Sequence, residues 1–553
     1  MKNLSILLLS LIFMFLLSLR SEIAAKDNIN NSSWEWNTFM GSSSDDRGYD
    51  IAVDVSGNVY VTGRSGATWG SPINAHAGWV DAFVAKLNSS GVLQWNTFMG
   101  SAVYDDFGLS IAVDGSGNVY VAGYSDATWG TPVNDYAGGN YDAFVAKLNS
   151  SGVLQWNTFM GGSDSDYGNG IAVDGNGNVY VTGDSRANWG TPKNAYAGGN
   201  YDAFAAKLNS SGELQWNTFM GSNGTDYGKS IAVDGSGNVY VTGLARYTWG
   251  SPVNAHAGGS DAFAEKLNSD GVRQWNTFMG SSSAISDAGN GITVDGSGNV
   301  YITGQSYDTW GNPINAHRRW EDAFAAKLNS SGVLQWNTFM GSPKKDYGHS
   351  IAVDGNGNVY ITGESDTTWG VPANAFTGDA YKDVFAAILN NSGVLLWNTF
   401  MGGSDNDYGN GIVVDGSGNV YVAGITYLYE WGTPVNAHAG WGNDAFAVKF
   451  EYTTAVEDEI DLNCPTEFNL SQNYPNPFNA ITSIKYALPN ADHVALKVYN
   501  TLGKEIKTLV NQFQTQGNYV IAFDATQLSS GIYLYELNAG NSHVQIKKMI
   551  LIK

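Results

Sequence analysis

One hexapeptide occurs seven times in this chain, and its spacing constrains the fold more than any other feature of the sequence. The motif Trp-Asn-Thr-Phe-Met-Gly recurs at intervals of 59 to 61 residues, beginning at Trp36, Trp95, Trp156, Trp216, Trp275, Trp336 and Trp397. A period of this length indicates a protein built from copies of one supersecondary unit. The copies also allow an internal comparison. A residue found in all seven serves the unit, whereas a residue found in one copy can serve an individual function.

Residues 108–161 show the pattern of one unit. Apolar or alternating runs at 109–114, 119–123, 143–148 and 153–160 predict four short strands. Tight Gly-rich turns connect the first strand to the second and the third to the fourth, and a longer loop containing Thr-Trp-Gly connects the second to the third. Four antiparallel strands repeated in tandem indicate the blade of a β-propeller.

The sequence Asp-Tyr-Gly-Asn-Gly-Ile-Ala-Val-Asp-Gly-Asn-Gly-Asn-Val-Tyr-Val-Thr-Gly at 166–183, followed by Asp-Ala-Phe-Ala-Ala-Lys-Leu at 202–208, resembles the repeat of the bacterial seven-bladed β-propeller family. The resemblance covers about 34–452 and implies an all-β, seven-bladed propeller with four antiparallel strands per blade. It also implies that the long loops and the links between blades share one face. A solenoid of stacked sheets is the alternative, because a period alone does not close a ring.

The two ends of the repeat region favour closure. The last copy has three strands and no fourth after Phe450, whereas residues 34–40 form a fourth strand with no blade before it. Pairing residues 34–40 with residues 445–450 would complete the seventh blade and remove two exposed sheet edges. We therefore expect the N-terminal strand to close the last blade.

The composition limits the possible partners and cellular location. A formal net charge of −23 argues against nucleic acid and anionic membranes, which proteins bind through Lys and Arg. Residues 1–25 resemble a signal peptide, with Lys2 before an apolar run that ends at Leu19 and is too short to span a membrane. Cys464 is the one cysteine, so an intramolecular disulfide framework is excluded. We expect a monomer without a metal or cofactor.

Several recurring residues have a local structural explanation that we prefer to a functional one. The first and third Asp of each repeat are expected to accept backbone N–H groups beside a strand rather than to bind a cation. The turn Asp-x-Ser-x-Asn at 114–118 lacks the Gly and Glu of a calcium loop, which favours an Asx turn. The first-ring aspartates are Asp46, Asp106, Asp166, Asp226, Asp287, Asp346 and Asp407, and the third-ring aspartates are Asp81, Asp142, Asp202, Asp261, Asp322, Asp383 and Asp444.

Aromatic rings also recur in the long loops, and we expect them to pack. One set follows Asn-Ala or its equivalent and holds a flat ring in every copy, which favours packing over metal ligation: His76, Tyr136, Tyr196, His256, His317, Phe376 and His438. The second set precedes a glycine, and burial of such large side chains would anchor each loop: Trp69, Trp129, Trp189, Trp249, Trp310, Trp369 and Trp431. Stacking of this second set against sugars is the alternative.

Residues that break the repeat on the long-loop face are the candidates for ligand binding. An exposed set of aromatic and arginine side chains suits recognition of a glycan or an acidic surface, and drift on surface loops is the alternative. The candidates are Trp79, Trp320, Trp441, Arg246, Tyr247, Arg318 and Arg319, and Arg64, Arg186, Tyr307 and Tyr427 break the pattern in the same way. No catalytic motif is evident, and near-identical blades offer little asymmetry for a reaction, so we expect no enzyme.

The repeat ends at Tyr452, and an acidic linker at 453–465 leads to a region at 466–553 whose alternating runs predict a small Ig-like β-sandwich. Leu-Ser-Gln-Asn-Tyr-Pro-Asn-Pro-Phe-Asn at 470–479 resembles the opening of the type A sorting domain of the type IX secretion system, with Ala480 as one departure. The residues that carry the resemblance include Tyr474, Pro475, Asn476, Pro477, Phe478, Asn479, Gly503, Gly531, Lys548 and Lys553.

This second resemblance implies export to the periplasm, recognition of the tail by the type IX machinery, and passage across the outer membrane of a Gram-negative bacterium. We therefore expect a secreted or surface-displayed cargo protein. We expect its propeller to bind a glycan or a protein at the cell surface. A structural spacer of the envelope is the second hypothesis, and a hydrolase or lyase is the third.

Overall fold

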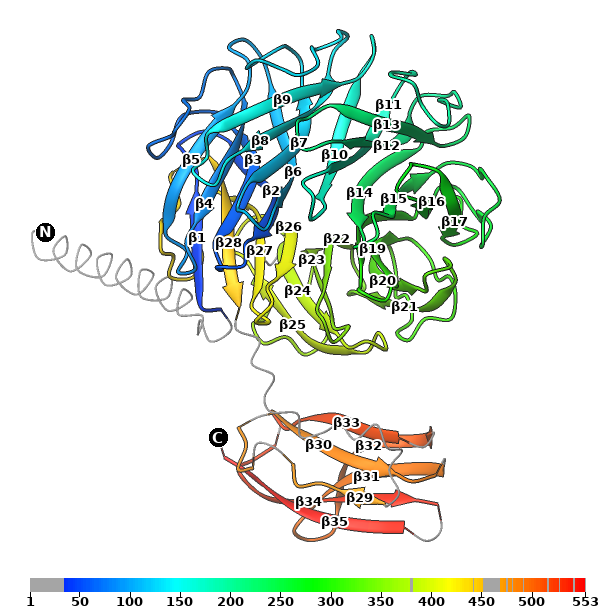
Figure 1. Ribbon diagram of the computed structural model, residues 1–553. Coiled ribbons are helices and arrows are strands. Elements are labelled where there is room, and N and C mark those ends of the chain that lie inside the picture. Colours follow the sequence, from blue (N-terminus) through cyan, green and yellow to red (C-terminus); the bar gives the residue numbers. More distant parts are fainter. Residues whose placement is uncertain are drawn as a thin grey trace, which may run out of the picture. The chain divides into compact units, whose positions relative to one another are not determined.

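The computed structural model describes residues 34–377, 381–440, 442–450, 468–473, 476–479, 481–490, 492–514, 517–526, 528–540 and 543–552. The expected signal at 1–25 and the expected linker at 453–465 lie outside the described residues. The chain divides into two compact units, residues 1–452 and 453–553. Every regular element in the described ranges is a β-strand (Figure 1).

The first unit contains seven sheets of four antiparallel strands, which confirms the predicted seven blades. Blade 1 consists of β2 (Asp46–Val53), β3 (Val59–Ser65), β4 (Asp81–Leu87) and β5 (Leu93–Met99). Blade 2 consists of β6 (Asp106–Val113), β7 (Val119–Ser125), β8 (Asp142–Leu148) and β9 (Leu154–Met160). Blade 3 consists of β10 (Asp166–Val173), β11 (Val179–Ser185), β12 (Asp202–Leu208) and β13 (Leu214–Met220). Blade 4 consists of β14 (Tyr227–Val233), β15 (Val239–Ala245), β16 (Asp261–Leu267) and β17 (Arg273–Met279).

The remaining blades follow the same order until the last. Blade 5 consists of β18 (Ala288–Val294), β19 (Val300–Ser306), β20 (Asp322–Leu328) and β21 (Leu334–Met340). Blade 6 consists of β22 (Asp346–Val353), β23 (Val359–Ser365), β24 (Asp383–Leu389) and β25 (Leu395–Met401). Blade 7 consists of β26 (Asp407–Val414), β27 (Val420–Tyr427), β28 (Asn443–Phe450) and the N-terminal strand β1 (Trp36–Met40).

Strand β1 closes the ring as predicted. It pairs antiparallel with β28, with Trp36 opposite Lys449 and Met40 opposite Ala445. Lys449 Nζ also lies 2.5 Å from Glu35 Oε2, just before the strand begins. Figure 1 shows the blue β1 beside the yellow-orange β28. The first and last parts of the unit therefore share one sheet, and neither leaves an unpaired edge there.

The first hairpin of each blade is fixed by an aspartate in its turn. Asp114 Oδ1 accepts hydrogen bonds from the backbone N–H groups of Ser116 and Asn118, each at 2.9 Å. Gly117 takes a positive φ of 77°, which a side chain would disfavour. The predicted Asx turn is confirmed.

The aspartates beside the strands also accept backbone hydrogen bonds, as predicted. The first-ring Asp46 accepts one from the Ser42 N–H at 2.6 Å, and the third-ring Asp81 accepts one from the Ala77 N–H at 2.7 Å. These bonds hold the link between blades and the end of the long loop against the strands that follow them.

The recurring aromatic rings of the long loops pack inside the blades. Trp69 is 7% exposed and meets Phe83 and Phe98 edge-on, with ring centroids 5.4 and 5.9 Å apart, and its six equivalents are equally buried. The ring of His76 lies edge-on to Phe98 at 5.4 Å, and Tyr136 makes the matching contact in blade 2. Both packing predictions are confirmed. Because their rings are buried, the Trp-Gly tryptophans have no free face for a sugar.

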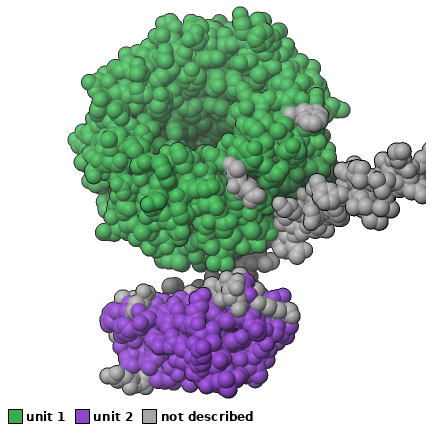
Figure 2. All heavy atoms as spheres, turned by 180° about the vertical axis from the view of Figure 1, so that it is seen from behind, with its two compact units in different colours: residues 1–452 green, residues 453–553 purple. Residues whose placement is uncertain are grey.

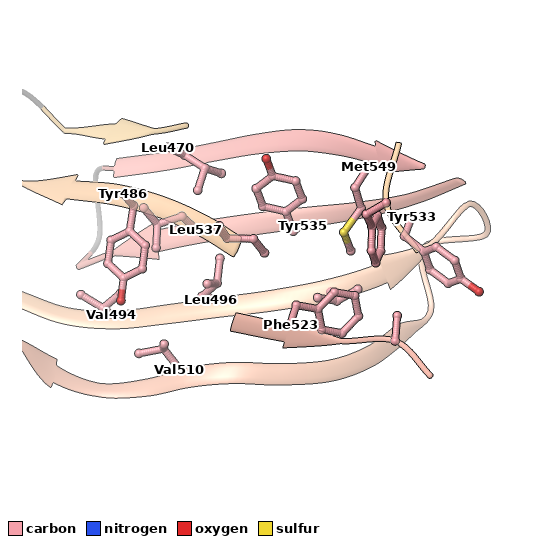
Figure 3. Close-up of a cluster of buried hydrophobic side chains, with 14 of the residues drawn as sticks. Leu470, Tyr486, Val494, Leu496, Val510, Phe523, Tyr533, Tyr535, Leu537 and Met549 are labelled. Carbon is pink, nitrogen blue, oxygen red and sulfur yellow. The ribbon is translucent and has the colours of Figure 1, made fainter. Parts of the chain in front are cut away.

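The second unit is a β-sandwich of two sheets, in the strand orders β29-β30-β33 and β32-β31-β34-β35. Its strands are β29 (Asn469–Leu470), β30 (Ile481–Leu488), β31 (Asp492–Asn500), β32 (Glu505–Gln514), β33 (Gly517–Asp524), β34 (Gly531–Ala539) and β35 (His543–Leu551). Leu496, Phe523 and Tyr535 belong to the apolar core between the sheets (Figure 3). The described ranges contain no helix that is long and apolar enough to cross a membrane.

Ring closure predicts the cost of one substitution in β1. Phe39 is fully buried against Trp431, just as Phe98 is buried against Trp69 in blade 1. Phe39→Ala should therefore lower the free energy of unfolding by about 3–5 kcal/mol, as much as the matched control Phe98→Ala. Guanidinium unfolding followed by tryptophan fluorescence measures both. A loss for Phe98→Ala alone would mean that β1 does not complete blade 7.

Candidate functional site

The innermost strand of each blade carries a β-bulge, and the bulged residue differs between blades. In β14, Gly228 pairs with Gly243 and Ser230 with Thr242, so Lys229 has no partner in the ladder. A bulge directs a side chain away from the regular pleat. The bulged residues, here called the channel belt, are Tyr49, Leu109, Asn169, Lys229, Asn290, His349 and Asn410. The innermost strands neighbour one another around the hollow visible at the centre of unit 1 in Figure 2.

Polar members of the channel belt bond to neighbouring blades. Lys229 Nζ donates to Asn290 Oδ1 of blade 5 at 2.7 Å, and Asn169 Nδ2 of blade 3 donates to the Gly228 carbonyl of blade 4 at 2.9 Å. Within blade 3, Asn169 Nδ2 also donates to Asp184 Oδ1 at 2.6 Å. Burial lowers the pKa of Lys229 to about 8 although the charge of Asp184 opposes the shift. Burial likewise raises the pKa of Asp184 to about 7. Lys229 and Asp184 therefore both change charge close to neutral pH.

Three further positions of each blade vary and lie at one end of the innermost strands. We call them the channel mouth. The first position follows the first-ring aspartate and holds Arg47, Phe107, Tyr167, Tyr227, Ala288, Tyr347 and Tyr408 in blades 1 to 7. The second follows the glycine of the second strand and holds Arg64, Tyr124, Asp184, Leu244, Gln305, Glu364 and Ile425. The third precedes the third-ring aspartate and holds Val80, Tyr141, Tyr201, Ser260, Glu321, Lys382 and Asn443.

Blades 2 to 4 contribute a continuous set of rings to the channel mouth, here called the aromatic arc: Phe107, Tyr124, Tyr141, Tyr167, Tyr201 and Tyr227. Phe107 and Tyr124 stack with centroids 4.6 Å apart, and Tyr124 meets Tyr167 of the next blade edge-on at 5.0 Å. The ring centroid of Tyr167 lies 6.1 Å from that of Tyr201. The five tyrosines are half-buried, so part of each side chain is exposed to solvent.

Two arginines lie on the faces of this arc. The Arg64 guanidinium lies 5.1 Å from the Phe107 centroid, and that of Arg186 lies 4.5 Å from the Tyr201 centroid. Both distances suit a cation–π interaction. Arg64 is also paired with Asp45, whereas Arg186 is exposed and has no ion pair with any described residue.

Across the channel, blade 6 carries an ionic cluster of His349, Glu364 and Lys382. Glu364 lies 2.8 Å from His349 Nε2 and 2.5 Å from Lys382 Nζ. Burial would raise the pKa of Glu364, but the hydrogen bond and charge of His349 and the charge of Lys382 outweigh it, so the pKa is lowered. Glu364 is thus held ionised, which suits fixing a charge more than donating a proton.

The ligand candidates predicted from the sequence are spread over several blades. Trp79 of blade 1 is 76% exposed and Trp320 of blade 5 is 54% exposed, but these blades are not neighbours in the ring. Arg318 lines a hollow of about 550 Å³ with Trp369 of blade 6. Arg246 and Tyr247 are exposed side by side in blade 4. Arg319 is exposed in blade 5, and Trp441 lies outside the described residues. Ligand binding by these residues stays a prediction.

The residues that carry the sorting resemblance come together in the second unit. Phe478 is buried, and its N–H donates to the carbonyl of Ile550 at 2.9 Å, while the Ile552 N–H donates back to the Phe478 carbonyl at 2.9 Å. Asn476 Oδ1 accepts from the Ile550 N–H at 2.9 Å. The opening motif and the last strand β35 therefore form one structural element.

The remaining sorting residues lie at turns, at the surface or outside the described residues. Gly503 takes a positive φ of 76° in the turn after β31. Gly531 begins β34, and the Lys548 side chain is exposed on β35. Pro477 and Asn479 flank Phe478 in the opening motif. Tyr474, Pro475 and Lys553 lie outside the described residues.

Comparison with known proteins gives two families. The beta-propeller repeat family matches seven segments, residues 39–68, 95–128, 155–188, 215–250, 280–314, 335–368 and 399–427. The secretion system C-terminal sorting domain family matches residues 472–553. Each propeller match falls on one repeat of the ring, and the sorting match spans most of the sandwich.

Individual relatives are distant. An uncharacterised WD repeat-containing protein of Acanthamoeba polyphaga mimivirus is 22% identical over 75% of this chain and 33% of its own length. Regulatory protein FlaEY of Caulobacter vibrioides is 26% identical over 34% of this chain and 19% of its own length. The chain thus spans at most about a third of these curated relatives.

Among solved structures, the WD40 domain of Neurospora crassa Pan2 aligns with a TM-score of 0.38 and 9% identity, covering 72% of this chain and 88% of that domain. A variant of the Synechocystis apocarotenoid oxygenase aligns with a TM-score of 0.35 and 10% identity, covering 70% and 87%. Likeness at this level carries no argument about function.

The two family matches agree with the strand pairing of both units. A sorting domain of this kind directs a chain to the type IX secretion machinery, so the protein is secreted or presented at the cell surface. The chain belongs to the bacterial proteins built from seven β-propeller repeats and a C-terminal type IX sorting domain.

Proposed function

We propose that the propeller is a non-enzymatic binding module, carried to the cell exterior by its sorting domain, and that the channel mouth binds a glycan. The observation that carries the proposal is the aromatic arc of blades 2 to 4. Seven blades share one framework, and a ring with one binding site must break its symmetry. The arc does so, because blade 5 places Ala288, Gln305 and Glu321 at the equivalent positions.

The chemistry of the arc suits a sugar. A pyranose ring presents apolar C–H faces that stack on aromatic faces, and its hydroxyl groups need hydrogen-bond partners at the edges. Half-buried tyrosines such as Tyr124 and Tyr201 offer both a ring face and a hydroxyl group. Arg64 and Arg186 add donors that can reach hydroxyl or acidic groups of a glycan.

An envelope spacer remains the alternative function. A spacer would need the ring and the sorting domain but no variable residues gathered at one mouth. The two functions therefore differ in one observable, which is saturable binding of glycans or surface extracts that depends on the arc.

Alanine substitutions in the arc should reduce glycan affinity. Binding of the mature chain to a glycan array, followed by calorimetry on the best ligand, gives the reference affinity. Tyr124→Ala and Tyr201→Ala should each weaken binding by about 5- to 30-fold, the loss of roughly 1–2 kcal/mol typical of a central aromatic contact. Trp79→Ala is the matched control and should change affinity less than twofold. The reverse pattern would move the site to the loop tryptophans, and no binding to any glycan would favour the spacer.

Removing the sorting domain should block delivery to the cell exterior. A chain that ends at residue 465 keeps the whole propeller but lacks the element formed by Phe478 and β35. We expect this variant to accumulate in the periplasm of a host with type IX secretion, as measured by cell fractionation and surface proteolysis. Phe478→Ala, which leaves a cavity in the same element, should reduce delivery partially. Unchanged delivery of the truncated chain would contradict the sorting role.

A further inference from the structure

Each junction between blades brings two buried aspartates to one glycine. This glycine is the last residue of the hexapeptide, and the aspartates are the third-ring residue of the blade before the junction and the first-ring residue of the blade after it. At Gly41, where the ring closes, the third-ring residue is Asp444. At Gly161, an added Cβ atom would lie 2.7 Å from Asp142 Oδ1 and 2.6 Å from Asp166 Oδ2. The same two oxygens face the glycine, within 3.0 Å of its Cβ position, at all seven junctions: Gly41, Gly100, Gly161, Gly221, Gly280, Gly341 and Gly402. The repeat therefore builds seven carboxylate pairs. In four of them a histidine also faces the third-ring aspartate: His76, His256, His317 and His438. The junction of Asp142 and Asp166 has a tyrosine, Tyr136, at the equivalent position.

The pairs are buried, and in several junctions at least one carboxylate oxygen has no hydrogen-bond donor among the described residues. Asp142 and Asp166 are at most 1% exposed. Asp142 Oδ2 accepts from the Ala137 N–H at 2.5 Å, and Asp166 Oδ2 accepts from the Gly162 N–H at 2.8 Å. Asp142 Oδ1 has no hydrogen-bond donor among the described residues. The equivalent oxygens without a donor include those of Asp202, Asp322 and Asp444.

Two ionised carboxylates next to each other in a buried site would destabilise the folded state. A buried carboxylate without a partner is strongly destabilised, and a second negative charge close to it adds repulsion. Burial raises the pKa of Asp142 to about 7, and the charge of Asp166 adds to the shift. Burial also raises the pKa of Asp166 to about 6. The titratable groups that face this pair from neighbouring segments are Asp164, Asp184 and Tyr136, and none of these is a cation.

We propose that the junction of Asp142 and Asp166 binds one proton at neutral pH, held on Asp142 Oδ1 and donated to Asp166 Oδ2. The bound proton makes Asp142 Oδ1 a hydrogen-bond donor, so this buried oxygen is no longer without a partner. The pair then carries one negative charge in place of two, and that charge is stabilised by the Gly162 N–H and the new O–H group. Because Asp142 begins β8 of blade 2 and Asp166 begins β10 of blade 3, the shared proton connects one blade to the next.

A divalent cation fits the junction less well than a proton. Calcium takes six to eight oxygen ligands. No group of three or more carboxylate, histidine or cysteine side chains that could hold a metal occurs in the described part of the chain. The Oδ2 atoms of Asp142 and Asp166 also face backbone N–H groups, which present positive charge to them. The proton is therefore the occupant that the junction favours.

A proton bound in this way fixes the direction in which the free energy of unfolding changes with pH. An unfolded aspartate has a pKa of about 3.9, below the folded value, so the folded chain binds more protons between about pH 4 and pH 7. Stability is then highest in mild acid and falls as pH rises through this window. Turn aspartates such as Asp114 have lowered pKa values because hydrogen bonds from Asn118 and Ser116 outweigh burial, and they oppose this trend only below about pH 4.

The test compares Asp142→Asn with Asp270→Asn in the full mature chain. An asparagine amide at position 142 can donate to Asp166 without needing a proton, whereas Asp270 is an exposed turn residue of blade 4 and does not face the pair. Unfolding equilibria are measured from pH 5 to pH 8. The slope of the logarithm of the unfolding constant against pH should fall by about one proton in Asp142→Asn and stay unchanged in Asp270→Asn. Asp50 and Asp184 titrate in the same range, so the difference between variants carries the test.

A second measurement does not depend on the variants being stable. The infrared spectrum of the folded wild-type chain in D₂O at pH 7 should show the carbonyl band of protonated carboxylic acids, and Asp142→Asn should reduce this band. Absence of the band at pH 7 overturns the proposal. An unchanged slope in Asp142→Asn also overturns it, as does a loss of thermal stability on adding a chelator, which would identify a bound cation instead.

Discussion

The structure depends on one strand pairing, that of β1 with β28. An open row of blades would leave an unpaired sheet edge at one end and an incomplete blade at the other. The contact between Trp36–Met40 and Asn443–Phe450 removes both and makes the blades equivalent. Once the ring is closed, the seven innermost strands face one channel, and their bulged residues and first residues gather around it. The position of the candidate site is thus a consequence of closure.

Residues shared by all blades and residues that differ between blades have different roles. Residues present in every blade, such as Trp69 and its equivalents, form the packing between and within blades. Residues that differ between blades gather at the channel belt and channel mouth, where the aromatic arc faces the ionic cluster. The acidity of the chain also belongs largely to the framework. If the junction of Asp142 and Asp166 keeps one proton, the formal charge of −23 overstates the negative charge of the folded protein at neutral pH.

The framework could be predicted from the sequence because seven copies reveal what each position tolerates. The ring packing at His76 followed from the flat side chains at its equivalents, and the closing strand followed from counting strands at both ends. The channel belt could not be predicted in this way. A bulge is a feature of register, so the direction of Lys229 or His349 becomes known only when the partner strand is placed.

The candidate site shows the same limit. Trp79 and Trp320 were selected because they interrupt a loop pattern, but Tyr124 and Tyr201 interrupt the pattern equally and contact rings that are distant in sequence. A break in the repeat pattern does not by itself show which of these residues contact one another in the fold. The aspartate pairs were also hidden, because each aspartate has a sufficient local role in accepting backbone N–H groups. Only the shared glycine shows that the two carboxylates converge.

Ring closure can be measured directly in the unmodified protein by zero-length carbodiimide cross-linking and peptide mass spectrometry. Glu35 and Lys449 lie at the two ends of the propeller sequence, with their charged atoms 2.5 Å apart. The pair Glu321 and Lys345, 3.2 Å apart between blades 5 and 6, is an internal control. A closed ring should give cross-linked peptides from both pairs at protein concentrations low enough to exclude intermolecular products. A cross-link between Glu321 and Lys345 without one between Glu35 and Lys449 would contradict the closed ring.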